Sequence, residues 1–155
     1  MYWLHNRQAG TQQAVSSAFK TMVNLIGATT RRAQLLEMSG GPEGTPNSTD
    51  CSIDWDIANK DATTAGTGTA ATPAKVNGDD GAAVLTASVN YTAEATTFTT
   101  LWNKSVNQRA TVEFRAYNEN EALIMQKTAS IGLGVRALSA TYTGTVLCAV
   151  RFAER

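Results

Sequence analysis

Three aspartates come closest to a catalytic or metal-binding arrangement in this sequence. Asp50 precedes the segment Cys51–Ile57, and Asp54 and Asp56 lie within it. The triplet Asp54-Trp55-Asp56 resembles the DxD motif that holds a metal ion and a nucleotide diphosphate. In an extended strand its two carboxylates would share one face, roughly 7 Å apart. The same spacing is typical of the solvated side of a half-buried strand. We favour that second interpretation because it also explains why Trp55 lies between the aspartates.

Other arrangements that could support catalysis are weak. His5 is the only histidine, whereas a serine or cysteine nucleophile needs a positioned histidine base and a zinc site needs several ligands. We therefore expect a protein that is not an enzyme and has no metal or cofactor. Cys51 and Cys148 are expected to be buried free thiols that act as small hydrophobic residues, with a disulfide or a metal site as the alternatives.

A glycine motif also has a structural explanation. The segment Gly132–Ala137 satisfies the GxGxxA pattern of dinucleotide-binding turns. That motif works only where a helix follows, because the helix N-terminus meets the pyrophosphate. The residues that follow, Leu138–Gly144, are β-branched and turn-like, so we predict a strand in which glycine permits a close approach.

Composition excludes several partners. The 155 residues include 13 Lys+Arg and 13 Asp+Glu, so the formal net charge is zero. Such a chain has no long-range attraction for nucleic acid or an anionic membrane. No apolar run approaches the roughly 18 residues of a membrane span, and no secretory signal peptide is expected. Charged residues make up only 17%, against about 25% in an average domain. A surface of this kind suits a protein whose faces are covered by neighbours.

The elements that would position these residues are β-strands. Alternation of apolar and polar residues with a period of two predicts half-buried antiparallel strands in three segments: Cys51–Ile57, Gln108–Ala116 and Thr145–Phe152. Weaker strand patterns occupy Thr21–Ile26, Ala33–Met38, Thr67–Thr72, Thr96–Trp102, Leu123–Met125 and Ile131–Val135. Turns rich in Gly, Asn and Pro separate them. We predict an all-β fold, an antiparallel β-sandwich or jelly roll of about eight strands.

The N-terminal region has two interpretations. We favour an extended arm over residues 1–18, followed by a β-sandwich domain over residues 19–155. The alternative is a helix with Thr11 as its N-cap, because apolar residues recur there at helical spacing through Ile26. In the arm, Tyr2, Trp3 and Leu4 are the candidate anchors onto a neighbouring subunit.

Further contact residues are expected elsewhere. Trp55 is predicted to lie in the core, and Trp102 to end a strand at the rim of a sheet. Arg109 and Arg115 lie on the polar face of the Gln108–Ala116 strand. They are candidates for ion pairs between subunits, with an ordinary solvated face as the alternative.

The order of several short motifs is informative. They run in series from Thr29 to near the C-terminus: Thr29–Arg32, Gly44–Asp56, Thr64–Pro73, Tyr91–Glu94, Asn107–Ala110, Ile131–Val135 and Tyr142–Val146. In this order they resemble a group of small virion structural proteins of tailed phages. The resemblance implies a capsid decoration (cement) protein with a β-sandwich or jelly-roll fold, commonly trimeric. It carries no functional residues over to this chain.

From the resemblance and the residues together we expect a non-enzymatic protein of the capsid surface, made in the host cytoplasm. It would stabilise the phage head by bridging subunits of the major capsid protein, as a homo-oligomer, most simply a trimer. The alternatives are another virion component, such as a tail-tube or fibre-base protein, or a carbohydrate-binding β-sandwich module.

Overall fold

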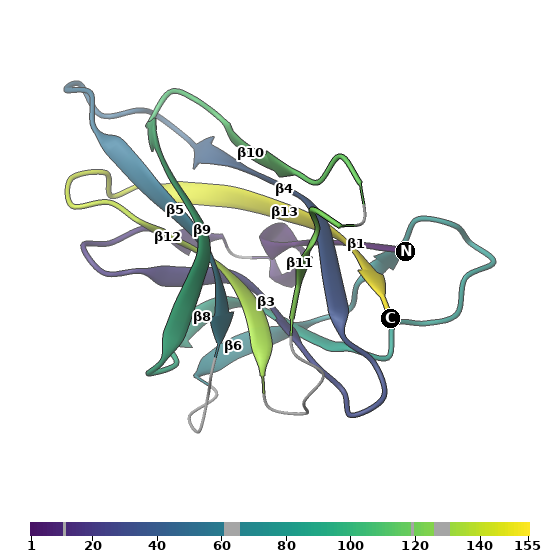
Figure 1. The fold of residues 1–155 in the computed structure, drawn as a ribbon. Coiled ribbons are helices and arrows are strands. Elements are labelled where there is room, and N and C mark those ends of the chain that lie inside the picture. The colour runs from purple at the N-terminus through teal and green to yellow at the C-terminus, as the bar shows by residue number, and fades with distance from the viewer. Residues whose placement is uncertain (11, 61–65, 119, 126–130) are drawn as a thin grey trace.

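Two antiparallel β-sheets packed face to face make up this protein. The computed structural model describes residues 1–10, 12–60, 66–118, 120–125 and 131–155. Figure 1 shows the two layers, with β4, β13 and β1 in one and β5, β12, β3 and β8 in the other. The predicted all-β sandwich is confirmed.

The first sheet, which we call sheet A, has seven strands in the described residues. Its hydrogen-bonded order is β10 (Val112–Arg115), β4 (Ala33–Glu43), β13 (Thr145–Glu154), β1 (Tyr2–His5) and β7 (Ala74–Lys75). Two short strands join it from the side, β11 (Leu123–Ile124) on β4 and β2 (Gln13–Ala14) on β13.

The second sheet, sheet B, has six strands in the described part of the chain. Their order is β6 (Thr67–Ala71), β8 (Thr86–Ala93), β3 (Lys20–Ile26), β12 (Gly132–Leu138), β5 (Ser52–Lys60) and β9 (Phe98–Asn107). A short 3-10 helix, η1 (Asn6–Ala9), follows β1.

The core lies between the sheets and follows the predicted alternation. On β5, Ile53, Trp55 and Ile57 are fully buried, as expected for the apolar set of a period-two strand. On β13 the buried set includes Cys148 and Phe152. The indole of Trp55 reaches across to β4, where a Cβ on Gly40 would lie 2.6 Å from its Cη2 atom. Glycine at position 40 is therefore what lets the indole lie against sheet A.

The N-terminal segment is not an extended arm. Residues 2–5 form β1, which pairs with β13 on one side and β7 on the other. Leu4 is fully buried and Tyr2 is 7% exposed, because their side chains alternate into the core. Buried Asn6 then donates from Nδ2 to the carbonyl of Val146 at 2.9 Å. The expectation of an arm over residues 1–18 is therefore wrong for this segment.

The helical alternative is also wrong where the chain is described. Residues 13–14 form β2 and residues 20–26 form β3, as the favoured strand interpretation of residues 21–26 predicted. Thr11, the proposed N-cap, lies outside the described residues.

Strand boundaries differ from the prediction at several places; β9, for example, continues to Asn107, beyond the predicted end at Trp102. The long alternating run at Gln108–Ala116 forms a strand only over residues 112–115, because residues 108–111 turn the chain between the sheets. β4 continues through Gly40-Gly41-Pro42 to Glu43, beyond the predicted end at Met38. β8 was not predicted at all, and Asn90 breaks its alternation with a left-handed φ of 53°.

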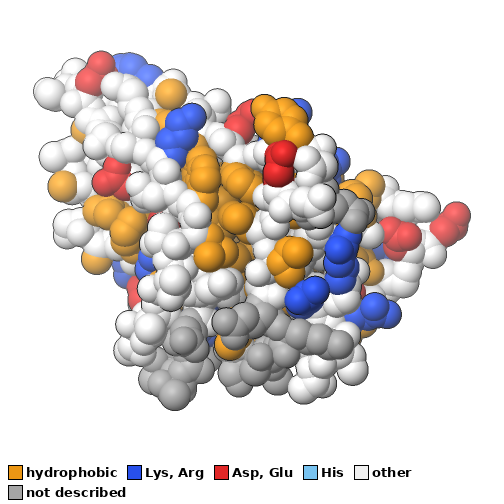
Figure 2. Space-filling model, viewed as in Figure 1, with side chains coloured by type: hydrophobic (Ala, Val, Ile, Leu, Met, Phe, Trp, Pro, Cys, Tyr) orange, Lys and Arg blue, Asp and Glu red, His pale blue; other side chains and the backbone are white. Residues whose placement is uncertain are grey.

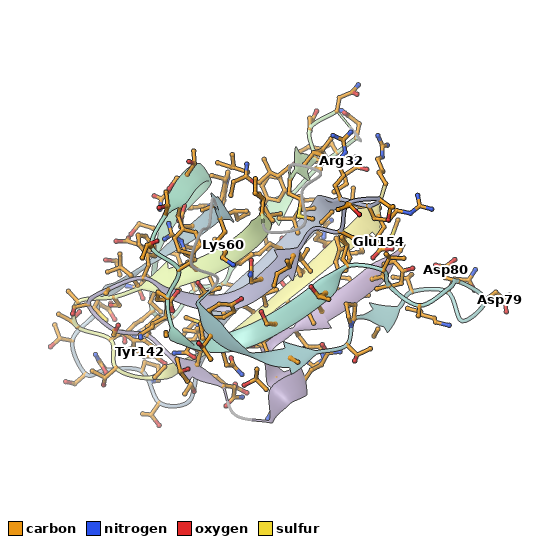
Figure 3. The ribbon with its side chains drawn as sticks, turned by 90° about the horizontal axis from the view of Figure 1, so that it is seen from below. Arg32, Lys60, Asp79, Asp80, Tyr142 and Glu154 are labelled. Carbon is orange, nitrogen blue, oxygen red and sulfur yellow. The ribbon has the colours of Figure 1, made fainter. Side chains whose placement is uncertain are left out.

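One loop projects from the body of the sandwich. In Figure 3, Asp79 and Asp80 lie at the tip of the loop that follows β7, far from Tyr142 at the other end of the molecule. Tyr2 holds this loop against the sandwich, because its hydroxyl donates to the carbonyl of Gly81 at 3.0 Å. Asp80 also accepts from the amino group of Met1 at 2.9 Å.

Candidate interaction site at the open edge of the sandwich

The four outer strands of the two sheets differ in length. β9 has ten residues, β6 has five, β10 has four and β7 has two. β9 pairs only with β5 among the described strands, so its other side is a free edge. A free edge presents unpaired N–H and C=O groups that can accept another strand. The length of β9 makes it the main candidate for such an interaction.

The hydrogen-bond register shows which backbone groups of β9 face outward. Gln108 and Cys51 are opposite each other at the end of the ladder, and the Gln108 N–H donates to the Cys51 carbonyl at 2.9 Å. Opposed residues of an antiparallel pair alternate between bonded and non-bonded. Asn103 and Ser105 are therefore at non-bonded positions, where their backbone N–H and C=O groups point away from β5. The backbone groups of Lys104, between them, bond to β5.

Protection of this edge is slight. Proteins usually shield a long edge with charges, prolines or bulges. β9 has one charged residue, Lys104, and one irregularity of register, opposite Ile57 and Ala58. A free edge of ten largely uncharged residues is longer than an average strand and would be an aggregation hazard in a lone subunit.

A groove runs beside this edge, between β9 and β10. It has a volume of about 500 Å³ and is lined by Trp102, Lys104, Glu113, Phe114, Arg115 and Tyr117. Figure 2 shows hydrophobic side chains exposed in a strip on this face, in the region between β9 and β10 of Figure 1. The open side of the sandwich thus exposes part of its apolar interior.

Two aromatic rings form the floor of the groove. Trp102 and Phe114 pack edge to face, with ring centroids 5.8 Å apart and planes at 66°. They come from different sheets, so their contact joins the two layers at this side. Tyr117, just beyond β10, is 88% exposed. Trp102 lies in the middle of β9, so the prediction that it ends a strand is wrong, although it does lie at the sheet rim.

The two cationic side chains of the groove, Arg115 and Lys104, differ in whether they form an ion pair with a described residue. Arg115 donates to Glu37 at 2.7 Å, and this hydrogen bond raises the pKa of Arg115 above its ordinary value. Glu37 also forms an ion pair with Arg151, with 3.1 Å between Glu37 Oε2 and Arg151 Nε. Lys104 belongs to none of the ion pairs between described residues. Its ammonium group is the cation that a partner could still pair with.

Gln108 anchors the turn between β9 and β10 through three hydrogen bonds to neighbouring backbone groups. Its fully buried amide donates to the carbonyls of Asn47 at 3.2 Å and Thr49 at 3.0 Å, and its Oε1 accepts from the Asn47 N–H at 2.9 Å. These bonds attach the turn to the segment between β4 and β5. The sequence did not predict this role. Gln108 does, however, occupy an even position of its alternating run, as the apolar residues Val112 and Phe114 do.

The residues predicted to contact other subunits differ in exposure: some are buried and others lie at the surface. Tyr2 and Leu4 lie in the core, so they cannot anchor a neighbouring subunit. Trp3 is partly exposed on sheet A, with the Arg151 guanidinium 5.8 Å from its ring centroid. Arg109 pairs with Asp50 at 2.7 Å, which lowers the pKa of that carboxyl. Arg109 and Arg115 are exposed but already paired within the chain, so a role for them between subunits stays a prediction.

The three aspartates do not form a site together. Asp56 is fully buried, and its Oδ2 accepts a hydrogen bond from the Nε of Arg136 at 2.8 Å. The Arg136 guanidinium also lies 4.6 Å from the ring centroid of Phe19 and 3.9 Å from that of Phe98. The solvated face we expected is therefore wrong for Asp56. Cross-strand pairing puts Asp56 opposite Arg136, a contact that spacing along one strand could not reveal. Within the described ranges, no three His, Cys, Asp or Glu residues are grouped as a metal ion would need.

The glycine motif is a strand, as predicted. Gly132 and Gly134 lie in β12, at the centre of sheet B. A Cβ on Gly132 would lie 2.6 Å from Oδ1 of Asn24, so glycine permits the close approach of a buried amide.

The cysteines are free thiols, as expected. Cys148 is buried on β13, and burial raises the pKa of its thiol. Cys51 is only partly buried, contrary to the prediction that both are buried. It lies just before β5, beside the loop that Gln108 holds.

Comparison with protein-family models, with curated proteins and with solved structures finds no match. Among the described residues, no helix is long and apolar enough to span a membrane.

Proposed function

We propose that this protein is a non-enzymatic structural component of a phage particle that decorates the capsid and stabilises it by bridging subunits of the major capsid protein. The observation that carries the proposal is the ten-residue free edge of β9, open beside an apolar groove. In a chain with only 17% charged residues, such an edge favours a state in which a neighbour covers it. The order of sequence motifs resembling phage virion proteins supports the same conclusion.

The physical basis of decoration is mass action. A protein that binds only to the assembled shell stabilises that shell by an amount that grows with the logarithm of the ratio of its concentration to the dissociation constant. The edge strands are already ordered by pairing within their sheets, so little conformational entropy is lost when the sandwich docks. A trimer, with jelly-roll connectivity of the strands, remains part of this proposal.

A carbohydrate-binding role is less well supported. Glycan platforms use flat, parallel aromatic rings, whereas Trp102 and Phe114 meet at 66°. Tyr117 is exposed, but it is a single ring beyond the end of β10.

The test is binding to shells. Purified full-length chain would be mixed with empty shells assembled from the major capsid protein of the same phage and then centrifuged. We expect saturable co-sedimentation and a higher temperature of shell disassembly. A chain that stays in the supernatant at a severalfold excess of shells would refute the proposal. Mass photometry of the chain alone separates the rivals, since a trimer has three times the 16.5 kDa chain mass and a tail-tube ring would have six times.

A further inference from the structure

We propose that β9 binds an extended segment of the capsid subunit as an added β-strand, and that this segment carries an acidic side chain facing Lys104 with an apolar side chain two residues away, over Trp102 and Phe114. The inference rests on the proposed function, because it takes the capsid subunit as the partner. It adds the mode of binding and the chemistry of the bound segment.

The backbone of β9 is suited to strand addition. The outward N–H and C=O groups of Asn103 and Ser105 lie two residues apart, the spacing at which an added strand makes paired hydrogen bonds. Both side chains are exposed, so neither blocks the approach. The Asn103 amide is turned back onto its own sheet, where its Nδ2 donates to the Trp55 carbonyl at 3.0 Å.

The side chains of β9 determine what the added strand would carry. Trp102 lies opposite Ile57 and Lys104 lies opposite Trp55, so both point to the groove side of the strand. Side chains of a bound strand alternate in the same way, and residues i and i+2 would face the groove together. One of them would cover the Trp102–Phe114 floor, and the other would meet the Lys104 ammonium group.

Charge complementarity favours a foreign segment over a second copy. β9 contains no acidic residue, so pairing two β9 strands would bring no counter-charge to Lys104. β6 has no charged residue at all. In β10, the residue two positions after Glu113 is Arg115, which is charged, and the apolar Val112 and Phe114 are its direct neighbours in sequence. Among the described strands, β6, β9 and β10 therefore do not match the required pattern.

A proline substitution tests the backbone contribution. Ser105→Pro removes one outward N–H, and the ring occupies the path of an added strand. Proline is tolerated on an edge strand where the N–H faces solvent, so the fold should persist. Ser105→Ala is the matched control, because it retains the N–H. We expect Ser105→Pro to weaken binding to empty shells at least tenfold and Ser105→Ala to change it less than twofold, with similar urea midpoints for both variants.

Two further measurements test the charge and the location. Lys104→Glu should weaken shell binding at least fivefold at low salt, because it would face the acidic side chain of the segment. Hydrogen exchange should show new protection of residues 98–107 when the wild-type chain is bound to shells.

The outcomes separate the two proposals. If the wild-type chain binds shells and Ser105→Pro binds equally well, strand addition is overturned while the decorating role stands. If the wild-type chain does not bind shells, both are overturned. If Ser105→Pro instead reduces the oligomer size of the chain alone, a second copy covers β9 and the assignment to the capsid subunit is wrong.

Discussion

Removal of the Asp56 carboxylate should be among the most damaging single changes in this protein. Asp56 is fully buried and Arg136 is 9% exposed, so both charges are largely shielded from water. One carboxylate oxygen, Oδ2, accepts from both Nε and Nη2 of Arg136. In Asp56→Ala the guanidinium would keep its contacts with Phe19 and Phe98 but lose the carboxylate with which it forms an ion pair.

The size of the effect follows from burial. Breaking a buried ion pair by removing one partner costs about 3–5 kcal/mol, because an uncompensated charge remains inside the protein. Cation–π contacts with the two phenylalanines would offset roughly 1 kcal/mol of this. We expect a net loss of about 3 kcal/mol, a large part of the roughly 5–15 kcal/mol that stabilises a typical domain. Asp56→Asn, which retains an acceptor oxygen, should lose less.

Urea unfolding followed by tryptophan fluorescence measures this directly. With an m-value of about 1–3 kcal/mol/M, the midpoint of Asp56→Ala should fall by roughly 1–3 M. The double variant Asp56→Leu/Arg136→Leu removes both charges and should be more stable than either single variant, since apolar replacement of a buried pair is often neutral. A loss below about 1 kcal/mol in Asp56→Ala, or single losses that simply add in the double variant, would refute the reasoning.

Three further predictions concern the core, the thiols and a buried lysine. Gly40→Ala should cost about 1–3 kcal/mol because its Cβ would lie 2.6 Å from the buried indole ring, whereas Gly41→Ala, 3.3 Å from a threonine methyl, should cost far less; thermal unfolding of both variants compares them. Burial raises the pKa of the Cys148 thiol, so a thiol reagent at pH 8 should modify Cys51 in the native protein and both cysteines only in urea; rapid native reaction at Cys148 would contradict the buried position. Lys60, at the end of β5 (labelled in Figure 3), is only 1% exposed, and burial lowers its pKa below the ordinary 10.5. Between its folded and unfolded pKa values the unfolded chain binds more protons, so stability rises with pH there; Lys60→Met should stabilise the protein most at neutral pH, and this gain should shrink toward pH 10.5 in urea titrations.

The fold class was predictable because it depends on local alternation. The periods of two around Ile53 and Val150 mark one side of each strand as apolar, and burial of that side needs a second sheet. β1 was missed because it is only four residues long and its alternation, Tyr2 and Leu4 against Trp3 and His5, includes a tryptophan on the outer face. β8 was missed because the left-handed Asn90 shifts its alternation halfway along.

The candidate site was only partly predictable. Trp102 was expected at a sheet rim, and Arg115 on a polar face, but nothing in either segment alone indicates that β9 and β10 lie beside one groove. Tyr2 and Leu4, which were predicted to be anchors, lie in the core instead. Sequence alone could not distinguish the two roles, because an apolar residue near a terminus looks the same whether it packs on a neighbouring subunit or on its own sheet.

The sequence by itself determined the strands with clear alternation, the burial of Trp55 and the strand character of the glycine motif, because each follows from how one segment distributes apolar and polar side chains. Tertiary structure decided which strands lie at the edges, that Asp56 meets Arg136, and that Lys104 has no ion-pair partner among the described residues. These properties depend on strand order and register, which arise from contacts between segments far apart in the chain. A period of two states which face of a strand is buried, but not which neighbour lies beside it or whether any neighbour does.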